Sequence, residues 1–164
     1  MEFKNITEIA NYIVSEGKGI LAADESNPTC AKRFDSIGVE SSEENRRDYR
    51  ELLFRSEGMK GNIGGVILFD ETIRQYAADG TSLVDLISSQ GALPGIKVDK
   101  GLQPIGDSKE SLTQGLEGLD ERLKEYFSLG AKFTKWRAVI NIDNLLPSSE
   151  AISANMQALA DYAK

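Results

Sequence analysis

The segment GIKVDKG, residues 95–101, predicts a short strand that carries charged side chains. Side chains alternate between the two faces of a strand, so Lys97 and Asp99 share one face, while Ile96 and Val98 share the other. Charges on an inner strand face are costly unless that face lines a polar site. We therefore expect this strand, taken as residues 95–100, to border such a site.

A second segment, FTKWRAV at residues 133–139, repeats this pattern. Lys135 and Arg137 fall on one face of the expected strand, and Trp136 and Ala138 fall on the other. Two charged strands of this kind in one small chain predict a shared polar site.

Apolar runs alternate with helical periodicity along the rest of the chain. Helices are expected at residues 5–16, 27–38, 42–55, 82–90 and 116–130 and after Pro147, strands at 20–23, 66–69, 95–100 and 133–140, and a polar loop at 101–111. One helix followed by four strand–helix pairs is typical of a parallel α/β sheet, whose active site lies at the carboxyl ends of the strands.

Composition excludes several classes of protein. The 164 residues predict one domain over residues 1–164, and the net charge of −7 argues against nucleic-acid or membrane partners. No apolar run has the length of a membrane span, and the N-terminal residues do not resemble a secretory signal. The single cysteine, Cys30, fits a reducing compartment, so we expect a cytoplasmic protein. Without any histidine, serine–histidine catalysis and most zinc sites are excluded, and no metal or cofactor is expected.

The charged candidates are expected at one end of the sheet. Two lysines and an arginine there, at positions 97, 135 and 137, favour a phosphorylated or carboxylated small molecule. Ser26 and Thr29 lie at an expected helix N-terminus, which is a natural seat for phosphate. Asp24 is a candidate proton acceptor, whereas Asp70 and Glu71 are expected to be solvated loop residues. A lysine crowded by other cations suits Schiff-base chemistry, but these residues alone do not identify a reaction.

Five motifs together resemble class I fructose-bisphosphate aldolase: GKGILAADES at 17–26, GGVILF at 64–69, GIKVDKG at 95–101, QGL at 114–116 and KWR at 135–137. The resemblance runs from about residue 5 to the end of the sequence. It implies a (β/α)8 TIM barrel that needs no metal. It also implies cleavage of fructose 1,6-bisphosphate to dihydroxyacetone phosphate and glyceraldehyde 3-phosphate, through a lysine Schiff base.

The resemblance also implies roles for single residues. Asp24 corresponds to the acid/base group that serves carbon–carbon cleavage, and Lys135 to a residue that assists proton transfer and stabilises charge. The implied substrate-binding residues are Lys97 and Arg137, which hold substrate, Asp99, which supports the lysines, and Arg33 with the Ser26–Thr29 turn, which lie near a phosphate.

The family's Schiff-base lysine lies on a later strand than any in this sequence. A full barrel takes about 250 residues, so the chain is expected to cover about the first four β/α units and an N-terminal helix. Such a half should associate as a homo-oligomer or with a complementary C-terminal half.

Three interpretations remain open for a chain of this length. The first is the N-terminal half of an aldolase, from a split gene, a truncated gene or an incomplete sequence, and we favour it. The second is a non-catalytic remnant that binds sugar phosphates or a partner chain. The third is a different lyase, in which Lys97 or Lys135 forms the Schiff base.

Overall fold

The computed structural model describes residues 3–164, which divide into two compact units. The first unit contains the chain up to Lys97 together with Lys124–Thr134, and the second contains Val98–Leu123 and Lys135–Lys164. This division does not test the expectation that residues 1–164 form one domain, which stays a prediction.

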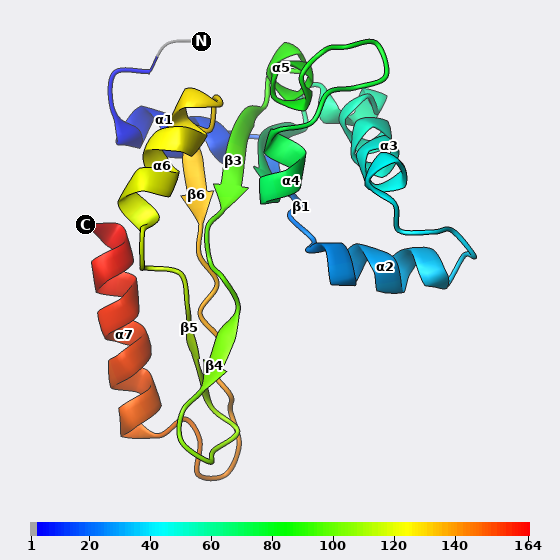
Figure 1. Ribbon diagram of the computed structural model, residues 1–164. Helices are drawn as coiled ribbons and strands as arrows, with labels where there is room; N and C mark the ends of the chain where they lie inside the picture. Colours follow the sequence, from blue (N-terminus) through cyan, green and yellow to red (C-terminus); the bar gives the residue numbers. More distant parts are fainter. Residues whose placement is uncertain (1–2) are drawn as a thin grey trace. The chain divides into compact units, whose positions relative to one another are not determined.

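A four-stranded sheet organises the first unit (Figure 1). Its strands lie in the order β1 (Gly19–Ala23), β2 (Ile63–Leu68), β3 (Leu93–Lys97) and β6 (Phe133–Lys135). β1 pairs with β2 in parallel, and β2 pairs with β3 in parallel. The prediction of a parallel α/β sheet is therefore confirmed.

One helix precedes β1, and the other helices of this part of the chain lie between the strands. They are α1 (Ile6–Ile13), α2 (Asn27–Asp35), α3 (Glu43–Phe54), the 3₁₀ helix η1 (Glu57–Met59), α4 (Asp70–Ile73), α5 (Leu83–Ser89) and α6 (Leu119–Ser128). Polar side chains begin four of them, because Asn5, Ser42, Ser56 and Ser82 each accept a hydrogen bond from a backbone amide in the first turn. Local capping chemistry thus sets where these helices start.

The two faces of the sheet differ in how well they are covered. Ala23, Leu68 and Ile96 stand side by side on one face, and all three are fully buried. On the other face Phe133 packs over Gly95 so closely that a Cβ atom at Gly95 would lie 2.3 Å from the Phe133 ring. Towards the β1 edge this second face is open, and Ile20 is 46% exposed.

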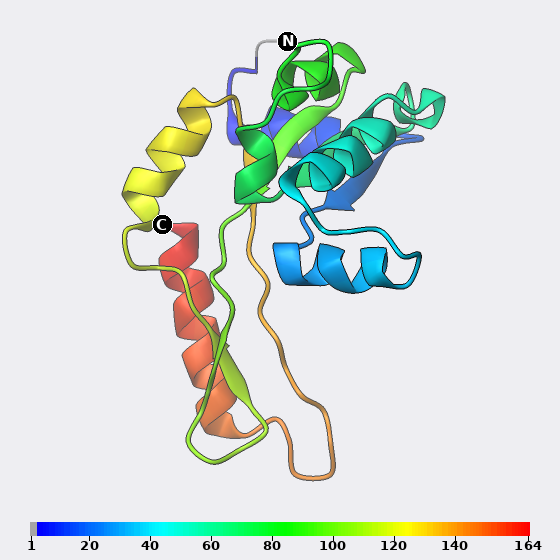
Figure 2. The same cartoon turned by 45° about the vertical axis from the view of Figure 1, so that its right-hand side comes forward.

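A hairpin and one long helix make up much of the second unit. β4 (Leu102–Pro104) pairs antiparallel with β5 (Ser111–Thr113), and α7 (Ser149–Ala163) runs beside β5 in both views (Figures 1 and 2). The buried Asn155 of α7 donates hydrogen bonds to the carbonyls of Ser111, at 3.1 Å, and Ala151, at 2.9 Å. The expectation of a plain loop at 101–111 is therefore wrong.

Two strands are shorter than their apolar composition predicts. β3 ends at Lys97, which leaves Asp99 outside it, and β6 ends at Lys135, which leaves Arg137 outside it. The reason lies in the backbone partners. The Lys100 amide donates to the Gln114 carbonyl at 2.7 Å, and the Arg137 carbonyl accepts from Thr113 Oγ1 at 2.6 Å. The backbone at Lys100 and Arg137 is thus bonded near the hairpin, whereas the Val98 amide still donates to the Lys135 carbonyl of β6 at 3.1 Å.

No helix within residues 3–164 is long and apolar enough to cross a membrane.

Candidate functional site

The strand register aligns Asp24 and Lys97 at the carboxyl end of the sheet. Ala23 of β1 pairs with Leu68 of β2, and Leu68 pairs with Ile96 of β3. Asp24 and Lys97 each follow this row by one residue, and both are half-buried. Alternation of side chains places them on the less covered face. A carboxylate and an amine two strands apart can together bind a polar ligand and move a proton.

Asp99, Lys135 and Arg137 belong to the second unit. Asp99 and Lys135 are half-buried, whereas Arg137 is exposed. Between Lys135 and Arg137 the Trp136 ring stacks on Tyr162, with centroids 5.2 Å apart and planes 26° from parallel. The convergence of these three residues with Asp24 and Lys97 stays a prediction.

The turn after β1 has the geometry expected of a phosphate-binding site. Ser26 is the N-cap residue of α2, and a proline follows within the first two helical positions. Ser26 Oγ and Thr29 Oγ1 share a 3.0 Å hydrogen bond. Both hydroxyls therefore lie at the positive end of a nine-residue helix, where an anion is stabilised.

Arg33 belongs to a cluster that sequence reasoning missed. Its guanidinium pairs with Glu25 and donates to Tyr49 Oη at 3.2 Å. Glu25 in turn pairs with Arg50 at 3.0 Å, and Arg50 is only 2% exposed. Mainly because the Glu25 carboxylate lies so near, the pKa of Arg33 is raised.

The spacing of arginines in α3 is the signal that could have revealed this cluster. Arg46 and Arg50 are four residues apart, so they share one helix face, and each reaches an acidic residue just beyond a strand. Arg50 meets Glu25 after β1 and Arg46 meets Glu71 after β2. Nothing in the sequence alone states which acid each arginine selects.

Glu71 and Asp70 begin α4 and are ion-paired, so the expectation of simply solvated loop residues is wrong. Arg46 binds Glu71 through Nε at 2.7 Å and Nη2 at 2.6 Å, and this pairing lowers the pKa of Glu71. Asp70 pairs with Arg74 at 2.9 Å and accepts a hydrogen bond from Tyr126 Oη, also at 2.9 Å. These contacts indicate a structural role.

Arg122 is a further residue that the sequence did not single out. Its Nη1 donates to the Val98 carbonyl at 3.0 Å, and its Nη2 donates to the Gly115 carbonyl. Gly115 has φ of 128°, and a Cβ atom there would lie 3.0 Å from the backbone of Val98 and Lys100. Arg122 and Gly115 thus hold the backbone on either side of Asp99.

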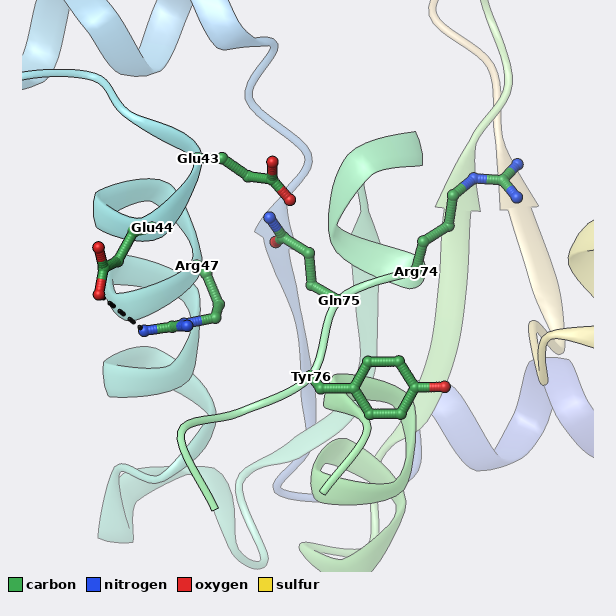
Figure 3. A pocket seen from close by; sticks show the side chains of 6 residues that line it. All are labelled: Glu43, Glu44, Arg47, Arg74, Gln75 and Tyr76. Carbon is green, nitrogen blue, oxygen red and sulfur yellow. Dashed lines mark ion pairs between the residues drawn. The ribbon is translucent and has the colours of Figure 1, made fainter. Parts of the chain in front are cut away.

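A surface pocket of about 490 Å³ lies apart from the predicted residues. Its lining comes from α3, through Glu43, Glu44 and Arg47, and from the segment after α4, through Arg74, Gln75 and Tyr76; Gln75 points toward Glu43, whereas Arg74 and Tyr76 point away from α3 (Figure 3). Glu44 and Arg47 form an ion pair at 3.8 Å. None of the residues predicted from the sequence lines this pocket, so it adds nothing to the expected site.

Comparison with known proteins identifies the family. The family model described as fructose-bisphosphate aldolase class-I matches residues 5–164. A "Probable fructose-bisphosphate aldolase class 1" of Xanthomonas axonopodis pv. citri is 53% identical over 164 residues, which cover 99% of this chain and 49% of that protein. "Fructose-bisphosphate aldolase 6, cytosolic" of Arabidopsis thaliana is 54% identical over 155 residues, covering 94% of this chain and 43% of that protein.

A solved structure supports the same family assignment. The structure of fructose-bisphosphate aldolase from Plasmodium falciparum, in complex with TRAP and a small molecule inhibitor, has a TM-score of 0.93 and 47% identity. The match covers 96% of this chain and 46% of that one, so the chain spans about half the length of the relatives it matches. By its sequence and its fold, this chain belongs to the class I fructose-bisphosphate aldolase family.

Proposed function

We propose that this chain forms the Asp24 and Lys135 side of an aldolase active site that cleaves fructose 1,6-bisphosphate reversibly. The observation that carries the proposal is the strand register, which aligns Asp24 and Lys97 at one end of a parallel sheet. The family match over residues 5–164 supports the same reaction. Products are dihydroxyacetone phosphate and glyceraldehyde 3-phosphate, as in glycolysis and gluconeogenesis.

Each residue takes one role in this proposal. Asp24 moves the proton during carbon–carbon cleavage, and Lys135 assists that transfer and stabilises charge. Substrate is held by residues that offer cations or hydroxyl groups, with Asp99 supporting the lysines: Ser26, Thr29, Arg33, Lys97 and Arg137. The lysine that forms the Schiff base belongs to the part of the family fold that lies outside these 164 residues.

The proposed architecture is a TIM barrel of which this chain supplies about the first four β/α units. Support comes from the partly covered face of the sheet, where Ile20 on the edge strand β1 is 46% exposed. A complementary C-terminal half, or a second copy of the chain, would cover that edge. We propose the cytoplasm as the location, in agreement with the name of the Arabidopsis relative, although a Chlamydomonas reinhardtii relative is named chloroplastic.

A complementation assay tests the proposal. Triose phosphate release is measured for the 164-residue chain alone and after addition of a separately expressed C-terminal half of a class I aldolase. We expect turnover only in the mixture. Turnover of about one per second or more by the chain alone would contradict the assignment of the nucleophile to the other half.

Reductive trapping gives an independent check. The chain alone is treated with dihydroxyacetone phosphate and borohydride, and its peptides are analysed by mass spectrometry. We expect no adduct, because neither Lys97 nor Lys135 is the nucleophile in this proposal. A reduced adduct on either lysine would favour a lyase that works with this chain alone.

A further inference from the structure

We propose that Glu25 and Arg50 are positioning residues that hold the Arg33 guanidinium and the turn at Asp24 ready for a phosphorylated ligand. The inference rests on the proposed function, in which Arg33 lies near a substrate phosphate. It assigns a task to two residues to which neither the sequence motifs nor the proposed reaction gives a role.

Arg50 contacts Glu25 at two points. Arg50 Nη1 lies 3.0 Å from Glu25 Oε2, and Arg50 Nη2 donates to the Glu25 backbone carbonyl at 3.0 Å. Because Arg50 is 2% exposed, loss of its partner would leave a buried charge uncompensated. Glu25 is the residue after Asp24, so this contact with its carbonyl also holds the backbone next to Asp24 in place.

The second oxygen of Glu25 is directed to Arg33. Glu25 Oε1 pairs with Arg33 Nη1 and accepts from Tyr49 Oη at 3.2 Å. Tyr49 Oη in turn accepts from Arg33 Nη1 at 3.2 Å. One carboxylate therefore joins a buried arginine on one side to a solvent-facing arginine on the other.

Arg33 needs this support because it is an exposed side chain with many rotamers. Its side chain is 56% exposed, whereas that of Glu25 is 10% exposed. Within residues 3–164 its hydrogen bonds use Nη1 alone, so Nε and Nη2 are left for an anion. A guanidinium held at one nitrogen, with two others available, is preorganised for two-point binding of phosphate.

The first experiment measures the order of Arg33 directly in the 164-residue chain. The Nε–Hε order parameter of Arg33 is determined by nuclear magnetic resonance for the wild type and for Glu25→Gln. We expect a drop from an ordered value to below about 0.6 in the variant. Tyr49→Phe, which removes only the hydroxyl bridge, should give a smaller drop and covers the case in which Glu25→Gln does not fold.

A matched control comes from α3 itself. Asp48→Asn removes a different ion pair, that of Asp48 with Arg47, and should leave Arg33 as ordered as in the wild type. An Arg33 that stays equally ordered in Glu25→Gln and Tyr49→Phe would overturn the inference.

The second experiment is a double-mutant cycle on ligand binding. The dissociation constant for fructose 1,6-bisphosphate is measured by calorimetry, with the C-terminal half added, for Glu25→Gln, Arg33→Ala and the double variant. If Glu25 acts through Arg33, Glu25→Gln weakens binding about tenfold in the wild-type background and less than about twofold in the Arg33→Ala background. An equal factor in both backgrounds would mean a general structural role and would overturn the inference.

Failure of the proposed function gives a different result. In that case the wild-type assembly binds no fructose 1,6-bisphosphate, while Glu25→Gln still releases Arg33 in the resonance measurement. The positioning of Arg33 would then stand, and its phosphorylated ligand would be another compound.

Discussion

The carboxyl ends of β1 and β6 are held in place by different kinds of interaction. After β1 the chain is anchored by charge, through the buried Arg50 and the Glu25 carboxylate. Around the end of β6 two neutral contacts hold the chain: the Val98 amide donates to the Lys135 carbonyl at 3.1 Å, and Trp136 stacks on a tyrosine. We therefore expect the stability of the β1 end to respond to acid and to charge-removing substitutions. The stability of the β6 end should respond to changes in packing.

The largest expected effect comes from removing a proposed catalytic side chain at the end of β1 or of β6. In the complemented assembly, Asp24→Ala and Lys135→Ala should each lower turnover about 100- to 10,000-fold, because each removes a group proposed to move a proton or stabilise charge. Steady-state assays give the rates, and size-exclusion chromatography checks that assembly is intact. Asp107→Ala, in the hairpin turn, is the control. Full activity in either of the first two variants would contradict its catalytic role.

A packing change should act strongly where β6 meets β3. Gly95→Ala places a methyl group 2.3 Å from the Phe133 ring, so we expect a loss of about 3 kcal/mol in the free energy of unfolding, as for other overpacked cores. Urea denaturation measures the change. Gly19→Ala, at a strand glycine with no atom within 4 Å of the added Cβ, is the matched control. Equal stability of the two variants would show that Phe133 moves aside without cost.

Charge-based support continues at the end of β2, and acid should weaken it. Glu71 has a lowered pKa, mainly because Arg46 donates two hydrogen bonds to it. Its contribution is therefore complete above its ordinary pKa and disappears as the pH falls through the lowered value. At pH 7, Glu71→Gln should cost about 2 kcal/mol in unfolding free energy, as expected for a hydrogen bond to a charged group.

The test of this prediction is a pH series. Unfolding free energies of wild type and Glu71→Gln are compared between pH 7 and pH 2, and the difference should shrink from about pH 4.5 downward. Asp79→Asn serves as the comparison, since the bond from the Thr81 amide helps to lower the pKa of Asp79 to about 2. A difference for Glu71→Gln that stays constant down to pH 2 would mean that its ionisation does not contribute to stability.

Sequence patterns predicted the first unit well because its elements have strong local signals. The strand expected at residues 20–23 was found at Gly19–Ala23, and the helix expected from Ser42 begins directly after that serine. A continuous apolar run and a capping hydroxyl are properties of neighbouring residues, so they can be read without knowing the fold. The alignment of Asp24 with Lys97 follows from the same strands.

The second unit was harder to predict because its contacts are long-range. β4 is exposed along its whole length, so its hairpin has little of the alternating apolar pattern that marks a strand. Val98 and Val139 suggested longer strands, yet the Lys100 amide bonds to Gln114 and the Arg137 carbonyl to Thr113, and only the folded chain defines these partners. Glu25 was missed for a similar reason, since it lies in the turn after β1 and its partner Arg50 lies 25 residues away on α3.

The smallest expected effect concerns the aromatic stack near the end of β6. Tyr162→Leu removes the ring that lies 5.2 Å from Trp136, and we expect a loss of about 1 kcal/mol in unfolding free energy, as for other aromatic pairs. Trp136 is the only tryptophan, so its fluorescence reports the change directly, with greater exposure to solvent and to quenchers. The control is Tyr76→Leu, at a tyrosine that is 61% exposed and has no ring contact within residues 3–164. Because the stack is neutral, the cost of Tyr162→Leu should be the same at pH 4 and pH 7, unlike that of Glu71→Gln. A cost that varies with pH in the same way would show that charge also supports the end of β6 and would remove the contrast with β1.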